Sequence, residues 1–172
     1  GYDTNRTVIT FIGSPEEVIY VALAIIKKAS ILIDMANHKG EHPRMGSTDV
    51  CPLIPILNVS TNECINYANQ LALKVSQLDI PVYLYEKSAK HNNRINLADI
   101  RKGEYEEFEN KINLKEWQPD YGKAIFNKKT GVTAIGVREF LIAYNINLNT
   151  IDKKIATDIA LDIREKGRLK RD

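Results

Sequence analysis

Two helix-start signals divide this chain, and each helix they predict is followed by an apolar run that favours an extended backbone. Ser14-Pro15-Glu16-Glu17 offers a capping hydroxyl, a proline suited to the first helical position, and two acids at the positive end of the helix dipole. Ser60-Thr61-Asn62-Glu63 has the pattern of a capping box. We therefore expect helices from these points to about Lys28 and Gln77.

The extended runs alternate with these helices. Proline at 52 and 55 excludes a helix from the extended run at 49–57. Strands are also expected at 6–13, 81–86, 132–137 and 140–148, with short helices near 96–102 and 104–112 and a last helix over about 150–166. This alternation predicts an α/β (α+β) protein. Because two strands follow each other near the end, we expect a mixed sheet with helices packed on one face.

Composition limits the class of protein. The 172 residues are 44% apolar and 27% charged, which predicts a folded domain with one substantial core. A net charge of +2 does not suggest a nucleic-acid partner. Cys51 and Cys64 lie in apolar surroundings and predict buried free thiols. No apolar run reaches membrane length, so we expect a cytoplasmic protein without a membrane partner.

The segment "NHKGEHPRMG" at 37–46 carries the densest chemistry in the chain. His38, Glu41 and His42 match H-x-x-E-H, a zinc pattern that works only on a helix, where positions four apart share one face. Gly40 and Pro43 both disfavour that helix. A zinc hydrolase is therefore the weaker alternative, and we expect no metal.

The same segment also suits acid/base chemistry. His42 is restrained by Pro43 and lies beside Glu41 and Arg44, so its backbone is shaped rather than free. A histidine titrates near neutral pH, and an arginine can hold a carboxylate with two parallel hydrogen bonds. The alternative, a solvated loop with no chemistry, stays open from the residues alone. Asp49 fits a loop cap as well as it fits a substrate contact.

Several stretches together resemble one enzyme family, glutamate formiminotransferase. They are "TNRTV" at 4–8, "LIDMANHKGEHPRMGSTDVCPLIPI" at 32–56, "PVYLY" at 81–85, "IRKGEYE" at 100–106 and "FLIAYNINL" at 140–148. The resemblance implies transfer of a formimino group from N-formimino-L-glutamate to tetrahydrofolate, a co-substrate, by a homodimer. It implies no metal. A folate-binding fragment without catalysis is the main alternative.

The resemblance also assigns residues. The family's catalytic histidine, in "EHPRMG", is matched by His42. From its own chemistry, Arg44 is expected on a carboxylate of glutamate or of the folate tail. His38, Glu41 and Arg6 are candidates for supporting roles, although an exposed side chain fits His38 and a structural salt bridge fits Arg6 equally well. The folate-binding loop is matched by "GKAIFNKKTG", that is, Gly122, Lys123, Ala124, Ile125, Phe126, Asn127, Lys128, Lys129, Thr130 and Gly131. The lysines of this loop suit an anionic folate, although an ordinary solvated turn has the same composition.

The family pattern also predicts the domain organisation. Residues 1–140 match its N-terminal subdomain without the first strand, which would precede Gly1. Residues 141–172 match the start of the C-terminal subdomain, a strand and a helix. Because much of the second subdomain is absent from this match, we expect the chain alone to lack parts that the reaction needs.

Overall fold

A computed structural model of the chain describes residues 1–142 and 146–163. Contacts between residues divide the chain into two compact units, Gly1–Phe140 and Leu141–Asp172. Each unit is described by itself. The identity of the second unit as the start of another subdomain stays a prediction.

The first unit is built on a three-stranded sheet. Its order is β1 (Val50–Leu53), β3 (Thr133–Val137) and β2 (Val82–Glu86). The central strand, β3, is therefore the one that comes last in the sequence. Both strand pairs are parallel. β3 is buried along its whole length, as a central parallel strand must be.

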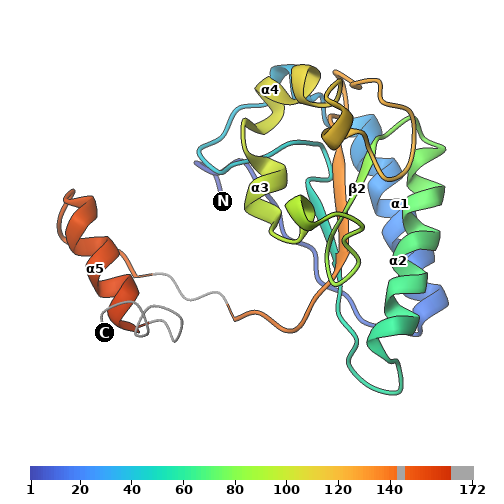
Figure 1. Ribbon diagram of the computed structural model, residues 1–172, viewed down its shortest axis with the longest axis horizontal. Helices are drawn as coiled ribbons and strands as arrows, with labels where there is room; N and C mark the ends of the chain where they lie inside the picture. The colour runs from blue at the N-terminus through green and yellow to red at the C-terminus, as the bar shows by residue number, and fades with distance from the viewer. Residues whose placement is uncertain (143–145, 164–172) are drawn as a thin grey trace. The chain divides into compact units, whose positions relative to one another are not determined.

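Helices cover both faces of this sheet (Figure 1). α1 (Pro15–Leu32) and α2 (Thr61–Ser76) pack on one face, where they share a core with Ile135 and Val137 of β3. α3 (Leu97–Arg101) and α4 (Glu104–Lys111) lie over the other face, where Ala134 of β3 packs with buried aromatic rings. Alternate residues of β3 therefore enter different cores, as the pleat of a strand requires.

Short 3₁₀ turns join these elements: η1 (Met35–Asn37), η2 (Asn92–Arg94) and η3 (Lys115–Trp117). The first follows α1 and leads into the histidine segment. The third begins the polar stretch that leads to β3. Two loops that precede strands, 37–46 before β1 and 122–131 before β3, thus lie toward the amino end of the sheet.

The expected helix caps are present. The backbone N–H and the hydroxyl of Ser14 both donate to the Glu17 carboxylate, at 3.2 and 2.6 Å. Ser60 and Glu63 form the reciprocal capping box, with the Glu63 N–H donating to the Ser60 hydroxyl at 3.2 Å. α1 continues four residues beyond Lys28, because Ala29, Ser30, Ile31 and Leu32 extend it without a glycine or proline to stop it.

The α/β class is confirmed, and three details differ from the expectation. The described strands form a parallel sheet rather than a mixed one, since β1 and β2 both pair with β3. Helices cover both faces rather than one. Residues 6–13 form no strand: their β-branched side chains are largely exposed, and among the described residues no strand pairs with them. Strand propensity without a paired neighbour does not make a sheet.

The second unit contains one described helix, α5 (Lys153–Ile163). The expected helix end at 164–166 lies outside the described residues. The expected strand at 140–148 falls partly on 143–145, which also lie outside them, and the described residues on either side carry no strand.

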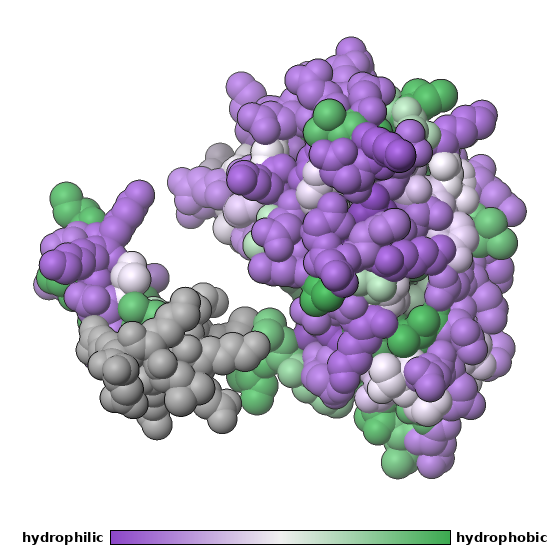
Figure 2. All heavy atoms as spheres, viewed as in Figure 1, coloured by the Kyte–Doolittle hydropathy of each residue, from purple (hydrophilic) through white to green (hydrophobic). Residues whose placement is uncertain are grey.

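The surface of the larger unit toward the viewer in Figure 2 is predominantly hydrophilic, with scattered apolar residues. Within residues 1–142 and 146–163, no helix combines the length and the apolar character needed to cross a membrane. Cys51 and Cys64 are both free thiols; Cys64 is buried, as expected, whereas Cys51 is half-buried.

Candidate functional site

Residues 37–46, called the His42 loop below, run along the N-terminal segment of the chain. Nδ2 of Asn5 donates to the carbonyl of Lys39 at 2.9 Å, and Nε2 of His38 lies 2.9 Å from the carbonyl of Asn5. Gly40 passes so close to this segment that a Cβ there would lie 2.4 Å from a backbone oxygen. The conformation of the loop therefore depends on contacts with Thr4 and Asn5, which are more than thirty residues away in the sequence.

The His42 loop does not have the helical geometry that the zinc alternative requires. After η1 ends at Asn37, the loop has no helical turn, so His38 and His42 do not share a helix face. The described residues contain no group of three or more side chains placed to hold a metal ion. The sequence matches H-x-x-E-H, but it lacks the helix on which that zinc pattern depends.

His42 is half-buried, and its hydrogen-bond partners differ at the two ring nitrogens. Nδ1 lies 2.8 Å from the carbonyl oxygen of Pro43, which can only accept a hydrogen bond. This partner assigns the ring proton to Nδ1. Nη1 of Arg6 lies 2.7 Å from both ring nitrogens. With the ring proton on Nδ1, Nε2 is the nitrogen that can accept a hydrogen bond from Arg6. In this tautomer, Nε2 presents a lone pair.

Behind Arg6 lies a compact ionic cluster. Nη2 of Arg6 lies 3.5 Å from Oδ2 of Asp49, and Arg101 donates to the same oxygen. The other carboxylate oxygen of Asp49 accepts the backbone N–H of Met45 at 3.0 Å. Asp49 therefore closes the end of the His42 loop, and it also joins Arg6 to Arg101. The loop-cap interpretation of Asp49 is supported by this contact.

Arg101 was not singled out from the sequence. It ends α3, more than fifty residues from the His42 loop, and nothing in its neighbours distinguishes it from a surface arginine at a helix C-terminus. Only the packing of α3 against the sheet brings it to Asp49. A spacing argument along the chain has no means of finding such a contact.

The side chain of Arg44 is buried. Its guanidinium forms a bidentate pair with Glu106, at 2.8 and 2.5 Å, and donates to Glu104 at 3.0 Å. Nη2 also donates to the carbonyl of His38 at 3.2 Å. The hydrogen bonds that Arg44 donates to Glu106 raise the pKa of Arg44 and lower the pKa of the Glu106 carboxyl. Arg44 thus ties the His42 loop to the start of α4, with its side chain only 8% exposed.

An open hollow of about 450 Å³ adjoins this contact. Lys39 and Gly40 line one side of it, and Gly103 with the two glutamates lines the other. The φ angle of +87° at Gly103 gives α4 its abrupt start and presents Glu104 and Glu106 to Arg44. The hollow is therefore lined by charges of both signs.

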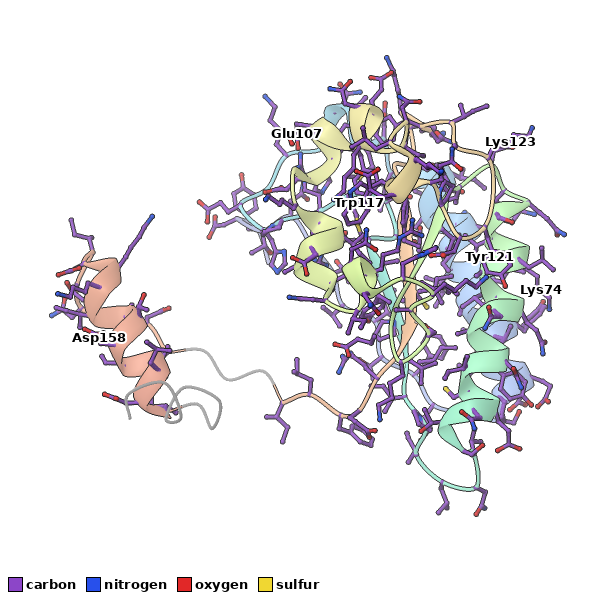
Figure 3. All side chains as sticks on the ribbon, in the orientation of Figure 1. Lys74, Glu107, Trp117, Tyr121, Lys123 and Asp158 are labelled. Atoms are coloured by element: carbon purple, nitrogen blue, oxygen red, sulfur yellow. The ribbon has the colours of Figure 1, made fainter. Side chains whose placement is uncertain are left out.

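The predicted folate loop, residues 122–131, begins beside the end of α2 and ends beside the His42 loop. At its start Gly122 lies against Ser76 and Pro81, and Nδ2 of Asn127 donates to the carbonyl of Asp79 at 3.0 Å. Lys123 projects outward from this start, on the side of the unit where α2 lies, as Figure 3 shows. The lysine at 123 is exposed, as a solvated side chain would be.

The end of the same loop joins the segment around the His42 loop through backbone hydrogen bonds. The N–H of Met35 donates to the carbonyl of Lys129, and that of Ser47 to Thr130, both at 2.8 Å. Gly131 pairs with Gly46 in an isolated antiparallel bridge. Two loops predicted from separate motifs therefore meet in one place, although only the 129–131 end of the second loop makes these contacts.

The other residues of the folate loop differ in exposure. Lys128 and Lys129 are exposed, and Nζ of Lys128 lies 3.2 Å from Glu109 of α4. Phe126 is half-buried, with its ring centroid 5.2 Å from that of Tyr105. The remaining members divide the same way, since Ile125 is exposed, Ala124 is half-buried and Thr130 is buried.

Comparison with known proteins agrees with this architecture. The family description that matches residues 1–138 is the formiminotransferase domain, N-terminal subdomain. The chain belongs to this family. It is 50% identical over 169 residues to the formimidoyltransferase-cyclodeaminase of Gallus gallus, a match that covers 98% of the chain and 31% of that protein.

Two microbial relatives carry a shorter name. The glutamate formimidoyltransferase of Streptococcus pyogenes serotype M1 is 44% identical over 164 residues, covering 95% of the chain and 55% of the relative. That of Thermoplasma acidophilum is 42% identical over 165 residues, with coverage of 94% and 54%. The formiminotransferase-family chain therefore spans about one third to one half of the relatives it matches.

Proposed function

We propose that this chain is part of a glutamate formimidoyltransferase, which transfers a formimino group from N-formimino-L-glutamate to tetrahydrofolate. Its membership of the formiminotransferase family and the names of its relatives support this activity. The observation that carries the proposal is the position of His42, in a loop joined by backbone contacts to residues 129–131 and with its ring beside Arg6.

The reaction requires one proton to move between two nitrogens. N5 of tetrahydrofolate attacks the amidine carbon of the donor, and a tetrahedral intermediate forms. The bond from that carbon to the glutamate nitrogen then breaks, giving 5-formiminotetrahydrofolate and L-glutamate. N5 loses a proton, and the departing nitrogen gains one. His42 is the acid/base group of the proposal: Nε2 accepts the first proton and returns it to the leaving nitrogen.

The other predicted site residues enter as parts of this proposal. The loop 122–131 binds the folate co-substrate, and the exposed Lys128 and Lys129 supply positive charge for its anionic tail. His38 supports the loop through its contact with Asn5. Glu41 is exposed beside His42 and available to solvent or substrate. The active protein is proposed to be a cytoplasmic homodimer in histidine degradation and one-carbon metabolism.

Arg44 has a different position within the proposal than the sequence suggested. Its guanidinium is already paired with two glutamates, so a substrate carboxylate at Arg44 has to compete with Glu106 for the same nitrogens. In the arrangement described here, Arg44 acts by holding the loop that carries His42.

The test is a transfer assay with tetrahydrofolate, N-formimino-L-glutamate and a metal chelator. After acid treatment, product is measured as methenyltetrahydrofolate by its absorbance. We expect product from the unaltered protein and a loss of about 10²–10⁴-fold in rate for His42→Ala, with its far-UV circular dichroism unchanged. Near-full turnover by His42→Ala would remove the histidine from the mechanism.

A second candidate function is folate binding without catalysis by this chain alone. The observation that favours it is coverage, because the chain spans only 31% to 55% of its relatives. Tetrahydrofolate binding, measured by isothermal titration calorimetry, without product in the transfer assay would support this second candidate. The same assay run with a longer relative as a positive control separates it from a failed assay.

A further inference from the structure

Two guanidinium groups converge on one carboxylate beside His42. Arg101 donates to Oδ2 of Asp49, and Nη2 of Arg6 lies 3.5 Å from the same oxygen. The three side chains are 15%, 27% and 10% exposed for Arg101, Arg6 and Asp49. This cluster of two positive charges and one negative charge is thus largely shielded from water. An excess positive charge in such a place favours an anionic ligand.

The two arginines are held unequally. One carboxylate oxygen of Asp49 accepts a hydrogen bond from Arg101, and the other accepts the backbone N–H of Met45. Its distance to Arg6 is longer, and Arg6 is the more exposed of the two arginines. Arg6 is therefore the guanidinium that can exchange its partner at the lower cost.

The position of Arg6 also determines what such an exchange does. Nη1 of Arg6 lies 2.7 Å from the His42 ring nitrogens, so a carboxylate bound by Arg6 lies beside the imidazole. Arg44 offers no comparable position, since Glu106 already occupies its paired nitrogens and its side chain is more deeply buried.

We propose that Arg6 binds a carboxylate of the acidic substrate beside His42, with Asp49 and Arg101 as positioning residues. The identity of that substrate as N-formimino-L-glutamate rests on the proposed function. When the carboxylate takes the Arg6 guanidinium, Arg6 leaves the ring of His42 and the Nε2 lone pair is freed for proton transfer. Arg6 thereby makes the acid/base group available in response to an acidic substrate.

The proposal is tested by binding of glutarate, a dicarboxylate that has no amidine and cannot react. Glutarate and its neutral analogue glutaramide are titrated into the chain, and the ring resonances of His42 are followed by NMR. We expect glutarate to shift these resonances and to bind about ten-fold or more tightly than glutaramide. Equal affinity for the two compounds would overturn the proposal.

Variants assign the effect to Arg6. Arg6→Gln should weaken glutarate binding about ten-fold or more and abolish the preference for the dicarboxylate. Arg6→Lys keeps the charge but not the two-pronged geometry, so it should restore part of the affinity. Arg138→Gln is the matched control: Arg138 follows the carboxyl end of the central strand β3, whereas the His42 loop precedes β1, and this change should leave binding unaltered.

The outcomes separate this inference from the proposed function. Unchanged glutarate affinity in Arg6→Gln, or no restoration by Arg6→Lys, would overturn the inference whatever the transfer assay gives. If Arg6-dependent binding of glutarate is found but the transfer assay with a complete relative shows no dependence on the matching histidine, the carboxylate site stands and the proposed reaction fails.

Discussion

Gly46 and Gly131 face each other across an antiparallel bridge with no space for a side chain at either position. A Cβ on Gly46 would lie 2.0 Å from the carbonyl oxygen of Val132, and one on Gly131 would lie 2.1 Å from that of Met45. Gly131 also has a φ of +64°, which an L side chain rarely adopts. This crossing is where the His42 loop and the predicted folate loop are joined.

Gly131→Ala should therefore destabilise the first unit by about 2 kcal/mol or more, because it combines backbone strain with a backbone clash. Loss of the crossing should also reduce folate binding, since the two loops no longer meet. Urea denaturation followed by circular dichroism measures the first effect. Gly13→Ala is the control, because a Cβ there makes only ordinary contacts and should change stability by less than about 0.5 kcal/mol.

The ion pair between Arg44 and Glu106 should make the free energy of unfolding depend on pH in the acidic range. The hydrogen bond from Arg44 lowers the pKa of Glu106 below its ordinary value of 4.5, so the folded state binds this proton less readily than the unfolded state. The pair therefore stabilises the fold above that ordinary value, and its contribution is lost as the pH falls through the lowered pKa. Because Glu106 is 61% exposed, solvent screens the pair and limits it to about 1 kcal/mol.

Glu106→Gln should accordingly reduce the free energy of unfolding at pH 7 and have a smaller effect at pH 3, because lower pH favours protonation of the carboxyl in the unaltered protein. Urea denaturation at both pH values measures this difference. Glu107→Gln removes the same charge from the same helix and should have a smaller effect at pH 7. An equal loss in both variants would show that helix charge, rather than the contact with Arg44, is responsible.

The sequence was sufficient to predict the elements whose causes are local. The caps at Ser14 and Ser60, the extended run after Val50 and the helices α3 and α4 all depend on neighbouring residues, and each is present. The expected strand at 6–13 depended on a pairing partner as well as on propensity. Since no strand among the described residues pairs with 6–13, this segment does not form a strand despite its β-branched residues.

The site shows the same division between local and distant causes. The density of polar residues around His42 and the glycine-bounded composition of 122–131 could be recognised along the chain. The partners of the two arginines could not, because Arg101 and Glu106 are brought there by helices that follow β2. The sequence favoured Arg44 over Arg6 for a substrate carboxylate, and only the contacts show that Arg44 is already paired with two glutamates.

The thiol of Cys51 should make the fold less stable at alkaline pH. Burial raises the pKa of Cys51 from an ordinary value of 9.0 to about 11. Between these values the unfolded chain loses the thiol proton while the folded chain keeps it, so the free energy of unfolding falls as the pH rises. One such group contributes a slope of at most about 1.4 kcal/mol per pH unit.

Cys51→Ala should make this slope shallower between pH 9 and 10, because the tyrosines contribute the same slope to both proteins. The free energy of unfolding, measured in urea at intervals from pH 7 to 10, gives the slope for both proteins. A cavity left by the substitution lowers stability equally at every pH, so it does not affect the comparison. Identical slopes in the two proteins would exclude Cys51 as the source.

The ion pair between Arg94 and Asp120 should contribute most to the stability of the stretch that leads into the predicted folate loop. Their side chains are 2% and 1% exposed, with 2.9 Å between Nη1 and Oδ2. Nη2 of Arg94 also donates to the carbonyls of Glu116 and Gln118, and Asp120 accepts the N–H of Leu84 in β2 at 2.8 Å. The pair therefore attaches residues 116–120 to the edge of the sheet.

Asp120→Asn should cost about 3–5 kcal/mol, because it leaves the charge of Arg94 buried without its partner. An asparagine at this position can still accept the N–H of Leu84, so the loss reports on the charge rather than on the backbone contact. Glu116→Gln removes an exposed carboxylate from the same stretch and should change stability by less than about 0.5 kcal/mol. Urea denaturation of both variants measures the difference, and a loss below about 1 kcal/mol in Asp120→Asn would mean that water or another group neutralises Arg94.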